Sequence, residues 1–258
     1  MRERLHNFVK YKDLFIELVR KDIKLKYKNS YLGVLWSFLN PLLMMIVLTI
    51  IFSEVFKNNI ENFPVYVLTG RLIYSFFSEA TNFAMNSIQV NSQLIKKIYV
   101  PKYFFPLSKI CSSFLTSLVS LIPIMIVMII TRMEFSIYNL LVFIPLIQIL
   151  LISAGIGLII ATIAVFFNDL KHLYSVLLML LMYMTPIFYP EEIIPEQFKW
   201  IIELNPLYSV LVIFRDLLMH NQLFSLFDFT IATGYSILYF IIGIFIFYKK
   251  QDKFIFHL

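Results

Sequence analysis

The feature that most constrains this chain is a series of apolar blocks, each long enough to cross a lipid bilayer. As an α-helix, about 20 apolar residues rise about 30 Å, which is the thickness of the hydrocarbon core. Of the 258 residues 60% are apolar and 15% charged, whereas soluble domains hold about 45–50% apolar and about 25% charged residues. The sequence therefore predicts an all-α integral membrane protein.

Six blocks are expected to become transmembrane helices. The second is the least apolar of them, because it contains Arg71 and Glu79. The six expected spans cover residues of about 34–56, 65–89, 106–130, 138–167, 173–188 and 227–248. Within a single transmembrane domain, residues 1–258, we distinguish an interface helix (1–32), spans one to five (33–188), an outer segment (189–226) and the last span with its tail (227–258).

Residues 8–28 have the period of an amphipathic helix. Leu14 and Leu18 fall on its apolar side, and Lys21 and Lys24 fall on the opposite side. Such a helix can lie in the membrane surface with its basic face toward anionic headgroups, or it can pack its apolar face on protein. Residues 1–28 hold nine Lys and Arg and no apolar run. We therefore do not expect a cleavable signal peptide here.

The outer segment has too many interruptions for a span. Pro190, Pro195 and Pro206 divide it, and Asn205 before Pro206 is typical of a helix cap followed by a first-turn proline. The sequence predicts two short helices that enter the membrane surface without crossing it. We interpret these residues, with Arg215, as a movable outer gate, and the alternative is a static lid that anchors the fifth and sixth spans.

The basic residues indicate the orientation. If the N-terminus is cytoplasmic, the cytoplasmic segments hold 17 Lys and Arg, the outer segments hold four, and Arg71 lies in the membrane, which accounts for all 22. Cytoplasmic loops of membrane proteins carry this excess of basic residues. Both termini are therefore expected in the cytoplasm, and the positive net charge of +6 gives no reason to expect nucleic acid.

Few side chains here could perform chemistry. A phosphate-binding P-loop needs a Gly-Lys pair, and none of the six glycines precedes a lysine. The four histidines are scattered singly, so neither a metal nor another cofactor is expected in the chain. Arg71 and Glu79 are costly inside a bilayer. They either form the polar wall of a substrate path, or Arg71 reaches the headgroups while Glu79 is hydrogen-bonded or protonated.

Several motifs in fixed order resemble one family. Leu32, Gly33, Trp36 and Pro41 follow the amphipathic helix. Further motifs are LTGRLIYSFF at 68–77, QLIKKIYVPKYFFPL at 93–107, FFNDL at 166–170 and NPLYSVLVIFRDLL at 205–218. Together they resemble the permease subunit of type-2 ABC exporters, in the branch that exports O-antigen, capsule-like glycans and teichoic acid.

This resemblance implies partners and a location. Two copies of a separate ATPase subunit would bind ATP and Mg, a second copy of the chain would complete a homodimer, and the substrate would be an undecaprenyl-type lipid-linked glycan. The location would be the cytoplasmic (inner) membrane. The short stretch 91–102 is similar to the helix that couples such permeases to their ATPase, and its coupling residues would be Gln93, Leu94, Lys96, Lys97, Tyr99 and Lys102.

Aromatic side chains make up 17% of the chain, and they could line a sugar path because their faces stack on sugar rings. The alternative is that they face lipid or the membrane surface, where aromatic residues are common. The residues we place beside the path, with Arg71 and Glu79, are Phe38, Tyr74, Phe77, Tyr183 and Tyr189.

Two other classes of function stay open at the level of sequence. An ion-coupled secondary transporter would need paired broken spans with buried carboxylates, and the spans offer essentially Glu79. A membrane-embedded glycan-modifying enzyme would need an acid and a base near the membrane surface. Glu191, Glu192 and Glu196 cluster on the outer side, but carboxylates beside prolines on a loop are usually only solvated.

Overall fold

The apolar blocks form helices because a helix satisfies every backbone hydrogen bond within its own segment, which lipid requires. The computed structural model describes residues 11–28, 30–33, 35–56, 60–97 and 100–258, and within these ranges all regular elements are helical. The α-helices are α2 Lys12–Lys26, α3 Leu35–Phe56, α4 Phe63–Val90, α5 Ser92–Lys97, α6 Phe104–Val119, α7 Leu121–Ile130, α8 Phe143–Phe166, α9 Leu170–Met184, α10 Glu196–Glu203, α11 Pro206–Leu218 and α12 Leu226–Lys250. The 3₁₀ helices are η1 Ile137–Val142, η2 Glu191–Ile193 and η3 Gln251–Phe256.

Among the described residues, three helical stretches are long and apolar enough to cross a membrane: Phe104–Ile130, Ile137–Phe166 and Leu226–Phe256. They coincide with the third, fourth and sixth expected spans. Leu35–Ile51 and Leu170–Met184 are apolar but shorter, and they coincide with the first and fifth. The second expected span is the long helix α4, which carries Arg71 and Glu79. The all-helical membrane class is thus confirmed.

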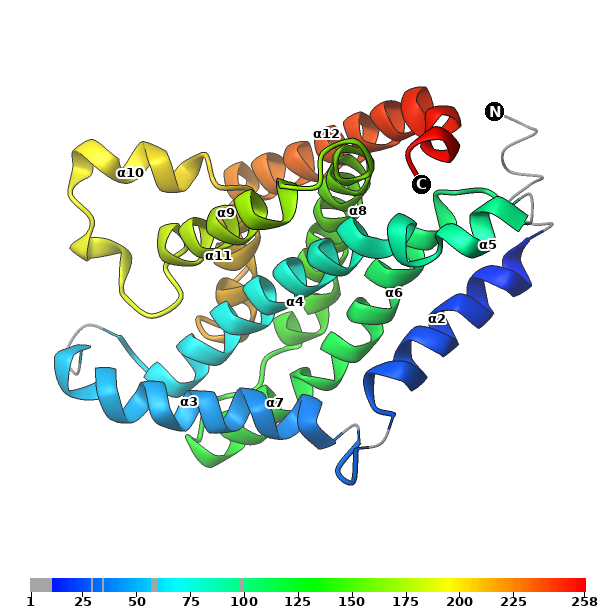
Figure 1. Ribbon diagram of the computed structural model, residues 1–258. Coiled ribbons are helices and arrows are strands. Elements are labelled where there is room, and N and C mark those ends of the chain that lie inside the picture. The colour runs from blue at the N-terminus through cyan, green and yellow to red at the C-terminus, as the bar shows by residue number, and fades with distance from the viewer. Residues whose placement is uncertain (1–10, 29, 34, 57–59, 98–99) are drawn as a thin grey trace.

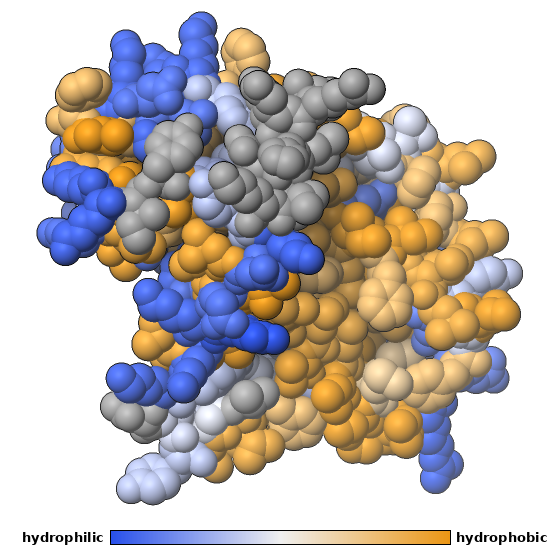
Figure 2. Space-filling view, turned by 90° about the vertical axis from the view of Figure 1, so that its right-hand side faces the viewer, coloured by the Kyte–Doolittle hydropathy of each residue, from blue (hydrophilic) through white to orange (hydrophobic). Residues whose placement is uncertain are grey.

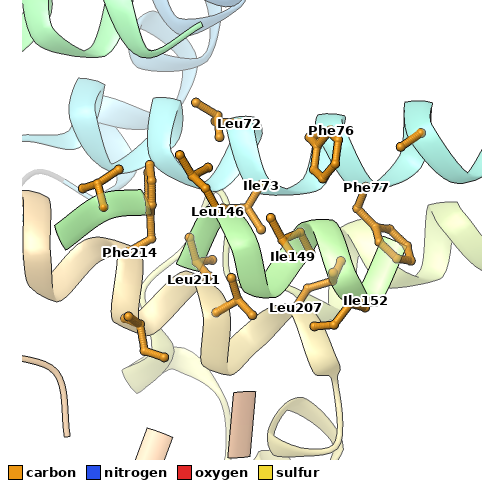
Figure 3. Close-up of a cluster of buried hydrophobic side chains, with 14 of the residues drawn as sticks. Leu72, Ile73, Phe76, Phe77, Leu146, Ile149, Ile152, Leu207, Leu211 and Phe214 are labelled. Atoms are coloured by element: carbon orange, nitrogen blue, oxygen red, sulfur yellow. The ribbon is translucent and has the colours of Figure 1, made fainter. Parts of the chain in front are cut away.

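The core forms where α4, α8 and α11 meet. Ile73 and Phe77 of α4 lie against Ile149 of α8, and Leu211 and Phe214 of α11 close the same cluster (Figure 3). These five side chains are at most 1% exposed. Helix α8 is therefore mostly covered by protein, whereas long stretches of α3, α9 and α12 expose apolar side chains, as a lipid-facing surface does.

Helices α8 and α12 cross at unusually close range. A methyl group added to Gly155 would lie 2.2 Å from the backbone oxygen of Tyr239, and one added to Gly243 would lie 2.3 Å from the backbone oxygen of Gly155. Only glycine leaves room for this approach, and small residues at such crossings are what allow helices in lipid to gain packing contacts.

The bundle has two distinct ends (Figure 1). We call the end that carries α2, α5 and η3 the α5 end, and the end that carries residues 60–62 and α10 the α10 end. At the α5 end Leu18, Ile95 and Phe254 are buried in one cluster, and Figure 2 views this end beside a broad apolar flank. The N-terminal helix therefore packs part of its apolar face on protein, where its Asp22 also pairs with Lys109 of α6 at 2.7 Å.

Candidate functional site

A charged pocket of about 360 Å³ opens between α2, α3, α4 and α6. We call it the α2–α4 pocket. It contains two cations, Lys26 and Arg71, and one carboxylate, Glu79. The other lining residues are Tyr27, Ser30, Trp36, Ser37, Asn40, Pro41, Leu68, Leu72, Ser75, Phe76, Ser113, Thr116, Ser117 and Ser120. Charges and hydroxyls thus gather among helices that are otherwise apolar.

The Leu-Gly pair builds one wall of the pocket by turning the chain. Gly33 has φ +49°, a left-handed conformation that costs glycine little and other residues more. Its N–H donates to the Ser30 Oγ at 3.1 Å. Because the turn joins α2 to α3 at this angle, Trp36 and Pro41 of α3 face the pocket that Lys26 of α2 also lines.

Glu79 is held by α2 and α6 rather than by Arg71. Its Oε1 accepts from the Lys26 Nζ at 2.5 Å and from the Ser113 Oγ at 3.3 Å, and the Lys26 Nζ also donates to the Thr116 Oγ1 at 3.2 Å. Among the described residues Arg71 has no ion-pair partner. The pocket therefore contains a neutralised pair and one cation whose charge is available to a ligand.

The α10 end is anchored by two polar side chains. The Asn205 Oδ1 accepts from the Leu207 N–H at 3.0 Å and so caps α11, while its Nδ2 donates to the Thr185 Oγ1 at 2.8 Å. Arg215 is 4% exposed, and its guanidinium lies 3.4 Å from the ring centroid of Tyr66 and donates to the Pro186 oxygen at 2.8 Å. These bonds fix α11 to α4 and to the end of α9.

The coupling segment forms the helix α5 at the opposite end. Ile95 is buried, whereas Gln93, Lys96 and Lys97 are exposed. The Lys102 Nζ donates to the Gln251 oxygen at 2.8 Å, and burial lowers the pKa of this ammonium group. Helix α5 thus presents a polar, basic face on an apolar anchor.

Residues 13–219 match the family described as ABC-2 type transporter. This chain belongs to that family. It is 35% identical over 245 residues to the O-antigen export system permease protein RfbA of Klebsiella pneumoniae, covering 94% of this chain and 93% of that protein. The protein of the same name from Myxococcus xanthus is 30% identical, covering 83% of each chain. The polysialic acid transport protein KpsM of Escherichia coli is 26% identical over 78% of this chain and 80% of its own length.

The residues predicted for the family motif and the substrate path of this ABC-2 transporter do not all lie in one place. Trp36, Pro41, Arg71 and Glu79 come together in the α2–α4 pocket, while Leu32 and Gly33 form the turn beside it. Phe38 is half-buried on α3 and does not line this pocket.

The other proposed path aromatics lie elsewhere. Phe77 is 1% exposed inside the core (Figure 3), so in this structure its ring packs on protein and does not line the α2–α4 pocket. The Tyr74 hydroxyl donates to the Leu178 oxygen of α9 at 2.8 Å. Tyr183 is 62% exposed, and its backbone oxygen accepts from the Tyr189 hydroxyl at 2.6 Å.

The residues predicted for ATPase coupling and for the outer gate also lie in different surroundings. Leu94 is half-buried against the α5-end cluster, and Tyr99 lies outside the described residues. Pro190 lines a pocket at the α10 end, and Pro195 precedes α10. Pro206 and Arg215 belong to α11 and Asn205 caps its start, so these three residues of the predicted gate lie at the helix that packs in the core.

Sequence reasoning missed Lys26 and the hydroxyls of α6. The signal was present, because Ser113, Thr116, Ser117 and Ser120 recur at intervals of three to four and so form one stripe on an apolar helix. Lys26 gave no such signal, since it is one of several lysines on α2 and only the tertiary structure brings it to Glu79.

Proposed function

We propose that this ABC-2 transporter chain is the membrane permease of an ATP-driven exporter of lipid-linked polysaccharide, with O-antigen as the substrate. The observation that carries this proposal is the 35% identity to an O-antigen export permease over 94% of the chain. Relatives named for polysialic acid transport and for capsule polysaccharide export cover more than three quarters of the chain. Long glycans are thus the shared substrate class of these relatives.

The α2–α4 pocket supports the proposal from the residues upward. Ionisable side chains among membrane helices are costly and usually mark a substrate path. Arg71 and the surrounding hydroxyls could bind the phosphate and sugar groups of an undecaprenyl-type lipid-linked glycan. An ion-coupled transporter would instead use a carboxylate that is free to take up the ion, and Glu79 is already paired with Lys26.

The arrangement of the subunits completes the proposal. Two copies of a separate ATPase bind ATP and Mg, and α5 docks on them through Gln93, Lys96 and Lys97. A second copy of the chain forms the other half of the conduit, and the exposed apolar side chains of α3, such as Ile46, Ile50 and Ile51, offer a surface for it. All six expected spans cross the inner membrane, with both termini and α5 in the cytoplasm and α10 outside.

Deletion and complementation test the function. Cells that lack this chain should accumulate lipid-linked polysaccharide inside, and the wild-type chain should restore surface polysaccharide. Purification of the wild-type chain should recover an ATPase subunit, with two copies of each by native mass spectrometry. Surface polysaccharide that is unchanged in the deletion strain, or export driven by a proton gradient with the chain alone, would contradict the proposal.

Two variants test the arrangement. Lys96→Glu with Lys97→Glu should uncouple ATP hydrolysis from export, while Lys249→Glu with Lys250→Glu, also at the α5 end but on α12, serves as the matched control. For the orientation, a cysteine at position 96 in a Cys111→Ala background should stay unlabelled by an impermeant thiol reagent in intact cells, whereas one at position 199 should be labelled. Labelling of position 96 would reverse the assigned orientation.

A further inference from the structure

A second pocket, of about 280 Å³, lies at the α10 end and is separate from the α2–α4 pocket. Four chain segments meet there: the start of α4 with the residues before it, the loop after α7, the loop with η2, and the C-terminal part of α11. We call it the α10-end pocket. The lining residues that matter for its chemistry are Glu61, Glu191, Glu192, Arg215, Asp216 and His220.

The pocket combines acceptors with a buried donor. Glu61, Glu191, Glu192 and Asp216 supply carboxylates, which only accept hydrogen bonds when ionised. Arg215 supplies a guanidinium, which only donates. The Arg215 Nε is buried and has no hydrogen-bond partner among the described residues. A buried polar atom without a partner destabilises the fold, so a ligand oxygen that accepts from this N–H would offset that loss.

Two of the carboxylates are already held in place. The Asp216 Oδ1 lies 3.0 Å from the His220 Nδ1 and accepts from the Gln222 Nε2 at 3.0 Å. The Glu191 Oε2 accepts from the Tyr208 hydroxyl at 2.7 Å. Side chains that are fixed by such supporting bonds lose little conformational entropy when a ligand arrives, which favours binding.

The charges restrict the class of ligand. No group of three or more His, Cys, Asp or Glu residues in the described part of the chain is arranged to hold a metal ion. Four carboxylates oppose an anion, and the buried Arg215 opposes an organic cation. A hydroxyl group satisfies both kinds of side chain, because it can donate to a carboxylate and accept from Arg215. At about 280 Å³ the pocket is near the lower limit of about 300 Å³ for small-molecule sites.

We propose that the α10-end pocket binds one neutral sugar residue, through hydroxyl groups that bridge the Arg215 Nε and the carboxylates of Glu192 and Asp216. The proposal rests on the proposed function, since the sugar would belong to the polysaccharide that leaves at this end. The pocket would then recognise the sugar unit of the exported chain, separately from the charged groups that the α2–α4 pocket holds.

Saturation-transfer NMR on the full permease–ATPase complex in lipid nanodiscs tests the site, with methyl glycosides of common hexoses and N-acetylhexosamines as probes. At least one probe should give a signal with the wild-type complex. Glu192→Gln and Asp216→Asn should each weaken its binding about tenfold, because each removes a charged acceptor. Glu196→Gln is the matched control, since Glu196 is an exposed glutamate outside the pocket, and it should leave binding unchanged.

The outcomes separate this proposal from the proposed function. If no probe binds, or if the pocket variants bind as the wild type does, the sugar site is wrong even where the chain still restores surface polysaccharide. Calcium binding by calorimetry that Glu192→Gln abolishes would also overturn it in favour of a cation site. If the deletion strain exports normally while the probes bind the wild type and not the variants, the sugar site stands and the export function falls.

Discussion

Helices α10 and α11 are neighbours in sequence, have a proline at their start and are both too short to span, yet their surroundings are opposite. In α11 the side chains of Leu207, Leu211 and Phe214 are fully buried, and the helix packs between α4, α8 and α12. In α10 the side chains of Phe198 and Trp200 are 48% and 58% exposed, and Ile202 is the one buried residue among its eight. Figure 1 shows α10 projecting from the bundle.

The difference shows that a short helix at the edge of a membrane protein can be either core or appendage. Helix α11 is held in place by its cap and by Arg215, so it is the fixed part of the α10 end. A movement of helix α10 would break few packing contacts, because its apolar side chains are already half-exposed. We therefore propose that a gate at this end moves residues 189–204 over a stationary α11.

The largest expected effect compares two phenylalanines. Phe214→Ala should lower the free energy of unfolding by about 3–5 kcal/mol, because it leaves a cavity in a packed core. Phe198→Ala should change it by no more than about 0.5 kcal/mol, as exposed substitutions usually do. Thermal unfolding of the purified complex in detergent measures both. Equal losses would show that another subunit covers α10.

Amide hydrogen exchange tests mobility directly. We expect the amides of α10 to exchange at least about a hundredfold faster than those of α11, which corresponds to about 2.7 kcal/mol in opening free energy. The reason is that α10 can open without breaking core contacts, whereas α11 cannot. Comparable protection in both helices, measured by mass spectrometry in nanodiscs, would make the whole outer segment a static lid.

The helix caps should differ by a smaller amount. Asn205→Ala removes the bond to the Leu207 N–H, which should cost about 1 kcal/mol, and the bond to the Thr185 Oγ1, which should cost about 1 kcal/mol more. Asn205→Ser should keep most of the cap and lose only the bond to Thr185. Pro195 caps α10 without a side-chain bond, so Pro195→Ala should have less effect than Asn205→Ala in the same unfolding measurement. The reverse order would mean that α10 is the better anchored helix.

The smallest effect depends on pH. The hydrogen bond with Asp216 raises the pKa of His220 above its ordinary value of 6.5. A raised pKa in the folded state means that this stabilisation is full below pH 6.5 and is lost as the pH rises through the folded pKa. Between about pH 6 and 9 the free energy of unfolding of the wild type should fall slightly, by under about 1 kcal/mol, because the His220 ring is half exposed and solvent screens its charge. His220→Gln should flatten this slope, and Glu196→Gln on α10 should leave it unchanged.

Several local features could be predicted from sequence because short-range rules decide them. The Leu-Gly turn needs a residue that tolerates positive φ, and Gly33 supplies it. Asn205 before Pro206 predicts a capped helix start, and the structure shows that cap. The burial of Phe77 in the core could not be predicted, because its neighbours in sequence, including Arg71 and Tyr74, say nothing about which way its ring points.

The sequence by itself determined the membrane class, the helical segments and the family, because each depends on the length and order of apolar blocks and motifs. Only the tertiary structure decided that Glu79 pairs with Lys26, that Arg71 lacks an ion-pair partner in the described part of the chain, and that α11 is core while α10 is not. The physical reason is that lipid-facing and protein-facing surfaces of a membrane helix are equally apolar. Periodicity therefore cannot tell one from the other, and the partners of each helix are fixed only when the helices pack.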